Sequence, residues 1–141
     1  MTGSDIKPLN WHPEPSIGYT VVRRPDGGMH FTFTHIDHAT LEHWRQFSSE
    51  HLLDSDRLTS NLYDLRQIET IPEEAKKVAL ELISDPATRN IRLGVVVSSE
   101  AVRQSILRIE DMSTPSGLEL KVFTDIGEAE AWLNRPLNLL V

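Results

Sequence analysis

Thr59-Ser-Asn-Leu-Tyr-Asp-Leu-Arg66 is the stretch of sequence that decides the fold. Its length and apolar residues predict a short buried strand. The residues that follow, Gln67-Ile-Glu-Thr-Ile-Pro-Glu-Glu74, predict a turn and the first turn of a helix, with Thr70 as N-cap and Glu73 as its capping-box partner. The corner between a strand and the next helix usually carries the working groups of an α/β fold, so we expect the functional surface here.

Strand and helix patterns alternate along the rest of the chain. Strands are predicted at 18–25, 29–35, 59–65, 90–97 and 118–124, and helices at 38–54, 72–84, from Ser98 or Ser99 to about Met112, and from Asp125 to Leu133. From the second strand onward each strand is followed by a helix, which leaves room for parallel crossover connections.

The first two predicted strands flank Asp26-Gly27-Gly28, a sequence typical of a tight hairpin. The first strand should therefore pair antiparallel and lie toward an edge of the sheet. The apolar run 90–97 suits a central strand that is buried on both faces. We predict a single α/β domain with a β(βα)4 mixed sheet and helices packed against it.

The domain should span residues 18–136, because both ends of the chain differ from it in composition. Residues 1–17 are polar and contain Pro8, Pro13 and Pro15, which predicts an extended N-terminal arm. Residues 137–141 form an apolar C-terminal tail, which either docks on the domain or contacts another chain. A homodimer through this tail or through a sheet edge is left open.

Composition narrows the classes of function. The chain has 141 residues, a net charge of −7 and no cysteine. The missing thiols exclude disulfides, thiolate metal sites and cysteine catalysis, and the acidic balance argues against nucleic acid as a partner. The N-terminus does not resemble a signal peptide, and no window approaches the roughly 20 apolar residues of a membrane span. We therefore expect a cytoplasmic protein that does not insert into membranes.

The candidates for catalytic and metal chemistry are weak. His30, His35, Asp37 and His38 lie close together in sequence, but neighbours in an extended stretch point in opposite directions, so we expect no metal site. Glycine-rich nucleotide motifs are missing, and no cofactor is expected. Ser98 and Ser99 lack the glycines of a nucleophile elbow, and helix capping accounts for both. We expect no enzyme, and an unrecognised hydrolase remains the weakest alternative.

Three segments together resemble the STAS or SpoIIAA-like family. These are Leu62-Tyr-Asp-Leu-Arg66, Val95-Val-Val-Ser-Ser99 and Val122-Phe-Thr-Asp-Ile-Gly-Glu-Ala-Glu-Ala-Trp-Leu133. The resemblance covers about residues 18–134 and implies a four-turn βα superhelix with an added strand. Its best-known members are anti-sigma factor antagonists, which bind a partner kinase and are switched by phosphorylation of a serine that opens the second helix.

This chain has a different sequence at the position of that serine motif. Counted from Asp64, the motif falls on Pro72-Glu-Glu-Ala75, which contains no hydroxyl. Glu73 lies near the acceptor position, and Thr70 is the nearest hydroxyl. The resemblance therefore implies a regulatory module without the usual phospho-switch.

Two functions follow as expectations. The first is a non-enzymatic regulatory or protein-interaction module that binds an unidentified protein partner or an anion at one corner, formed by Arg66, Thr70, Glu73, Glu74, Ser98 and Ser99. The alternative is a carrier of a lipid or small apolar ligand, with a pocket between sheet and helices lined by Phe31, Phe33, Trp44, Phe47 and Trp132. At strand and helix spacing such residues more often form a plain core.

Overall fold

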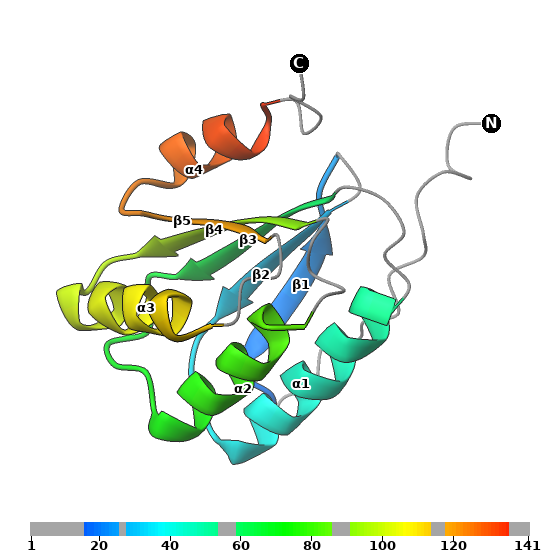
Figure 1. The fold of residues 1–141 in the computed structure, drawn as a ribbon, viewed down its shortest axis with the longest axis vertical. Coiled ribbons are helices and arrows are strands. Elements are labelled where there is room, and N and C mark those ends of the chain that lie inside the picture. Colours follow the sequence, from blue (N-terminus) through cyan, green and yellow to red (C-terminus); the bar gives the residue numbers. More distant parts are fainter. Residues whose placement is uncertain (1–15, 26–27, 54–58, 86–90, 114–117, 136–141) are drawn as a thin grey trace.

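The computed structural model describes residues 16–25, 28–53, 59–85, 91–113 and 118–135 (Figure 1). They form five strands and four helices: β1 (Tyr19–Arg23), β2 (Met29–Phe33), α1 (His38–Leu53), β3 (Thr59–Leu65), α2 (Glu73–Ile83), β4 (Ile91–Val97), α3 (Glu100–Met112), β5 (Glu119–Phe123) and α4 (Ile126–Leu133). Each predicted element is present within a few residues of its expected bounds. Most of the predicted arm and all of the predicted tail lie outside the described residues.

The strands form one sheet in the order β1-β2-β3-β4-β5. β1 pairs antiparallel with β2, and the backbone N–H of Arg24 donates to the carbonyl of Gly28 at 2.8 Å across the hairpin. The pairs β2–β3, β3–β4 and β4–β5 are parallel. The predicted β(βα)4 mixed sheet, with its first strand at one edge, is confirmed.

Helices cover the two faces of the sheet unequally. Figure 1 shows α1, α2 and α3 on one face and α4 alone on the other. Side chains alternate between these faces, as strand geometry requires: Leu65 and Val95 join the core beneath the three helices, whereas Leu62 and Val96 pack with α4. The last helix therefore closes a second, smaller core.

β4 is one of the two inner strands of the parallel part and is buried on both faces, as predicted. Gly94 lies where α4 approaches most closely. A Cβ atom at Gly94 would lie 3.3 Å from Cδ1 of Leu133, which is tighter than ordinary van der Waals contact. The missing side chain allows α4 to pack directly on the strand.

Arg92, also on β4, is buried although it is charged. Its Nη1 donates to the carbonyl oxygens of Trp132 at 3.3 Å and Arg135 at 3.1 Å, and its Nε donates to Oε1 of Glu119 at 3.0 Å. The guanidinium also lies over the Trp132 ring, 5.2 Å from its centroid. Arg92 thus donates side-chain hydrogen bonds to carbonyl groups at the C-terminal end of α4.

A second buried cation reaches the same helix end from the β1 edge of the sheet. Arg24, just after β1, donates from Nη1 to Oε1 of Glu130 at 2.6 Å and from Nη2 to Oδ1 of Asn134 at 3.2 Å. Positive charge at a helix C-terminus is stabilising because it opposes the negative end of the helix dipole. Both arginines therefore fix α4 through polar contacts as well as through its apolar face.

The larger core contains a cluster of aromatic rings. Tyr63 stacks on Phe31 with ring centroids 4.3 Å apart and accepts a hydrogen bond at its hydroxyl from Nε1 of Trp44 at 3.0 Å. Burial of the phenol raises the pKa of Tyr63 to about 12. The folded state therefore holds this hydroxyl in its neutral form.

We expect Tyr63 to make the protein sensitive to alkaline pH. A folded-state pKa above the ordinary value of about 10 gives stability that is present below pH ~10 and is lost as pH rises toward ~12, on the order of 2–3 kcal/mol. The free energy of unfolding of the wild type and of Tyr63→Phe is measured in urea at the same pH values. All other titrating groups are present in both proteins, so the difference between the two reports the Tyr63 hydroxyl alone. The stability difference between the two should change between pH ~9 and ~12 by that amount; a constant difference would contradict the assignment.

Candidate functional site

The loop between β3 and α2 is attached to the core by two isoleucines. Ile68 is buried, and its backbone N–H donates to the carbonyl of Leu65 at 3.1 Å. Ile71 is half-buried and packs against the same core. Because these two side chains point inward, Glu69 and Thr70 between them are exposed.

Two serines at the end of β4 connect this loop to the next strand–helix corner. The hydroxyl of Ser98 donates to the carbonyl of Arg66 at 2.6 Å, and that of Ser99 donates to the carbonyl of Glu69 at 3.0 Å. Ser99 is also the N-cap of α3, accepting from the backbone N–H of Val102 at 3.3 Å. Both serines therefore hold the loop in place. The predicted capping role is confirmed for Ser99 and is wrong for Ser98, whose hydroxyl bonds the loop instead.

Arg66, the first residue of the loop, is folded back on Asp64. Its Nε and Nη2 donate to the two carboxylate oxygens of Asp64 at 2.9 and 2.8 Å, and its backbone N–H donates to Oδ1 at 3.1 Å. These hydrogen bonds hold the pKa of Asp64 below its ordinary value. The guanidinium is partly exposed, but its charge is already neutralised by Asp64.

The start of α2 differs from the predicted capping box. Pro72 occupies the N-cap position, and no side chain caps this end of the helix. Thr70 is two residues too early, because the backbone stays extended through Pro72 (φ −63°, ψ 155°) before it turns into the helix. The capping-box prediction for Thr70 is wrong, and the threonine hydroxyl is left on the surface.

The surface of this corner is acidic. Glu73 forms an ion pair with Lys76 at 2.8 Å, and this hydrogen bond lowers the pKa of its carboxyl. Glu42 and Glu69 make no ion pair within the described ranges of the chain. The carboxylates of Glu73 and Glu74 lie at the N-terminus of α2, where negative charge interacts favourably with the helix dipole.

The structure places the six predicted corner residues around one loop. Arg66, Thr70, Glu73 and Glu74 lie on the loop or on the first turn of α2, and the two serines contact the loop backbone. We call this set, together with exposed Glu69, the corner surface. The serines fix the loop backbone. The exposed members of the corner surface are Arg66, Glu69, Thr70, Glu73 and Ser98, whereas Glu74 and Ser99 are half-buried.

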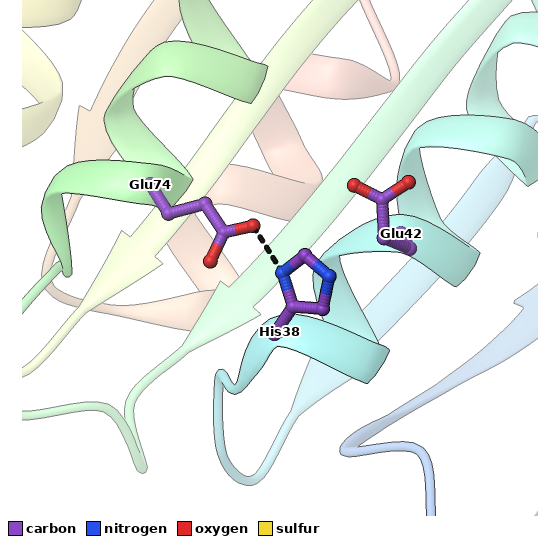
Figure 2. Close-up of side chains that lie close together, drawn as sticks. All are labelled: His38, Glu42 and Glu74. Carbon is purple, nitrogen blue, oxygen red and sulfur yellow. Dashed lines mark hydrogen bonds and ion pairs between the residues drawn. The ribbon is translucent and has the colours of Figure 1, made fainter.

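A cluster of one histidine and two carboxylates, which shares Glu74 with the corner surface, was not predicted from the sequence. His38 opens α1, and its Nδ1 lies 2.5 Å from Oε2 of Glu74 on α2 (Figure 2). Glu42 lies one turn further along α1, and one donor atom from each of the three residues lies within 4.8 Å of the others. The His-x-x-x-Glu spacing on a predicted helix was a readable signal, but nothing in the sequence indicated that Glu74 would join it.

The five residues of the predicted apolar pocket do not share one site. Phe31, Phe33, Trp44 and Phe47 pack together in the larger core, with ring centroids about 6 Å apart for the Phe31–Phe47 and Phe33–Trp44 pairs. Trp132 lies on the opposite face of the sheet, against Phe123. The difference arises because α4 follows β5 to the face that the other helices leave open.

The described helices include none that is both long and apolar enough to span a bilayer. Among the residues described, Ser98 and Ser99 form no hydrogen bond with a histidine, since both hydroxyls donate to backbone carbonyls.

Comparison with known proteins identifies the fold. No family model and no curated protein matches the chain. The crystal structure of an anti-sigma factor antagonist from Mycobacterium paratuberculosis is similar with a TM-score of 0.60 and 18% sequence identity, covering 82% of this chain and 92% of that one. The chain therefore has the STAS or SpoIIAA-like α/β fold of an anti-sigma factor antagonist, as the resemblance in its sequence implied.

Proposed function

We propose that this protein is a non-enzymatic regulatory module that binds a protein partner through the corner surface. The observation that carries the proposal is an exposed loop whose backbone is fixed at two points, by Ser98 on Arg66 and by Ser99 on Glu69. A loop held in one conformation loses little conformational freedom when a partner docks on it. The shared fold with an anti-sigma factor antagonist supports a regulatory role.

The charge of the corner surface indicates the kind of partner. Glu69 is exposed and makes no ion pair with any described residue, and Glu73 is 82% exposed despite its contact with Lys76. A partner that presents lysine or arginine would be guided to this surface by complementary charge.

We further propose that the module works without phosphorylation at the start of α2. The first turn of that helix begins Glu73-Glu74-Ala75 after Pro72, so the exposed Thr70 hydroxyl is the nearest one in the loop. A carboxylate carries about half the charge of a phosphate and is a weak substitute for it. Phosphopeptide mapping of the protein from its own cells should find no phosphate on residues 59–80, and modified Thr70 would contradict this part of the proposal.

The partner-binding surface is tested by charge reversal. Glu69→Lys with Glu73→Lys inverts the exposed carboxylates and leaves both serine contacts in place. In quantitative affinity capture from the source cells, at least one protein retained by the wild type should fall by about tenfold or more, equivalent to ~1.4 kcal/mol. The direct Kd of that protein, once purified, should change by the same factor.

A matched control reverses two charges at the far end of α3. Glu110→Lys with Asp111→Lys makes the same change in net charge but places it in the last turn of α3, whose first turn adjoins the corner surface. It should retain the same proteins as the wild type. Loss of the partner from both variants, or from neither, would contradict docking at this corner.

The lipid-carrier alternative remains a separate proposal without a supporting contact. The four aromatic residues that share a site pack against one another, as core residues do. The stability of Phe31→Ala, measured together with native mass spectrometry for a bound apolar molecule, distinguishes a plain core from a ligand pocket.

A further inference from the structure

We propose that His38, Glu42 and Glu74 form a binding site for a zinc ion that joins the first turns of α1 and α2. The prediction of no metal site considered histidines that are neighbours in sequence. The structure instead brings one of them, His38, next to carboxylates from the following turn and from another helix.

The three donors are arranged around a common point. Nδ1 of His38 lies 2.5 Å from Oε2 of Glu74, and one donor from each residue lies within 4.8 Å of the other two. Figure 2 shows the imidazole between the two carboxylates, with Glu42 on the same face of α1 and Glu74 reaching across from α2. Donors of a tetrahedral zinc ion lie roughly 3.4 Å apart at metal–ligand distances near 2.0–2.2 Å. A bound ion would therefore replace the direct contact of His38 with Glu74 and separate these two donors by about 1 Å.

The charge of the cluster also favours a cation. Two carboxylates converge on one neutral or singly charged imidazole, and Glu42 has no ion-pair partner in the described part of the chain. His38 is 74% exposed and Glu74 is 43% exposed, so an ion can enter without any movement of the backbone. Water would complete the coordination, as in zinc sites with three protein ligands.

The combination of one imidazole nitrogen with two carboxylates indicates which metal ion would bind. Magnesium and calcium prefer sites made entirely of oxygen, whereas an imidazole with carboxylates suits zinc and related transition metals. The donors come from two helices, α1 and α2, so a bound ion would connect His38 and Glu42 to Glu74, a member of the corner surface.

The test measures zinc binding to the full-length, tag-free protein by isothermal titration calorimetry and equilibrium dialysis. We expect one zinc ion per chain and no binding of magnesium at the same concentration. Removal of an outer-shell partner weakens metal binding about 10–100-fold, so loss of a direct ligand in His38→Gln or Glu42→Gln should weaken zinc binding by more than about tenfold. Glu42→Gln preserves helix propensity and keeps the test valid if His38→Gln disturbs the start of α1.

Two control variants match these changes. His35→Gln removes another exposed histidine, which lies 3.5 Å from Asp37, and Glu50→Gln removes an exposed carboxylate from the same helix as Glu42. Both should bind zinc as the wild type does. The proposal is overturned if the wild type binds zinc more weakly than a Kd of about 1 mM, if His38→Gln and Glu42→Gln bind as the wild type, or if the controls lose binding equally.

Discussion

Replacing Phe31 with alanine is expected to lower the free energy of unfolding by about 3–5 kcal/mol, since deletion of a buried aromatic ring removes its transfer free energy and leaves a cavity. The ring is 1% exposed, stacks on Tyr63 at 4.3 Å and meets the edge of Phe47 at 6.0 Å. Urea denaturation with linear extrapolation measures the change.

Val22→Ala is the matched control for this substitution. Val22 lies on the edge strand β1 and is 59% exposed, so its truncation should change stability by no more than about 0.5 kcal/mol. The same two variants show whether the aromatic residues around Phe31 form a plain hydrophobic core or line a ligand pocket. If Phe31→Ala costs less than about 1 kcal/mol and releases a bound apolar molecule seen by native mass spectrometry, the carrier alternative is supported and the core assignment is contradicted.

Replacing Arg92 with methionine is expected to destabilise the protein by about 2–4 kcal/mol, because the carbonyl groups at the end of α4 and the carboxylate of Glu119 would lose the guanidinium as a donor. The guanidinium is 2% exposed and pairs with the carbonyls of Trp132 and Arg135. Methionine keeps much of the apolar volume of the arginine side chain, so the loss of stability measures the contribution of the polar contacts. The effect should concentrate in α4, and hydrogen exchange of its amide groups should accelerate more than that of β3.

An exposed arginine provides the comparison. Arg103 is 44% exposed and lies 3.5 Å from Glu100 within α3. Arg103→Met should change stability by no more than about 0.5 kcal/mol, since exposed ion pairs contribute little. Equal losses for Arg92→Met and Arg103→Met, or unchanged amide exchange in α4, would show that the buried guanidinium does not hold the last helix.

The fold was predictable because its signals are local. In β2 the alternation of Met29, Phe31 and Phe33 with polar residues indicated a strand with one buried face, and these three side chains are buried. In β4 the continuous run of apolar residues indicated a strand that is buried on both faces. Short-range periodicity identifies such elements without knowledge of their partners.

The partners of buried charges were not predictable. Arg24 contacts Glu130, 106 residues away along the chain, and Arg92 contacts carbonyls at the end of α4. In the sequence both arginines read as ordinary polar residues. The prediction that Trp132 shares a pocket with the other aromatic residues was wrong for a related reason. No local sequence pattern indicates which face of the sheet a helix covers.

The candidate site was partly predictable. Ser98 and Ser99 were expected at the corner, but as members of its binding surface or as caps; their hydrogen bonds to the carbonyls of Arg66 and Glu69 depend on how two loops lie side by side. The contact of His38 with Glu74 joins residues 36 positions apart and depends on the packing of α1 beside α2.

The strand order has a consequence for how the protein is made. Every strand pairs with its neighbour in the sequence, so each step of assembly closes a chain segment of modest length. A nascent chain can extend its sheet strand by strand in the order of synthesis. α4 is made after the other described helices, and until it docks, Leu62 and Val96 lack its cover on their side of the sheet. The ribosome-bound intermediate therefore presents an apolar strip on that side, and a chaperone that acts during translation would meet it there.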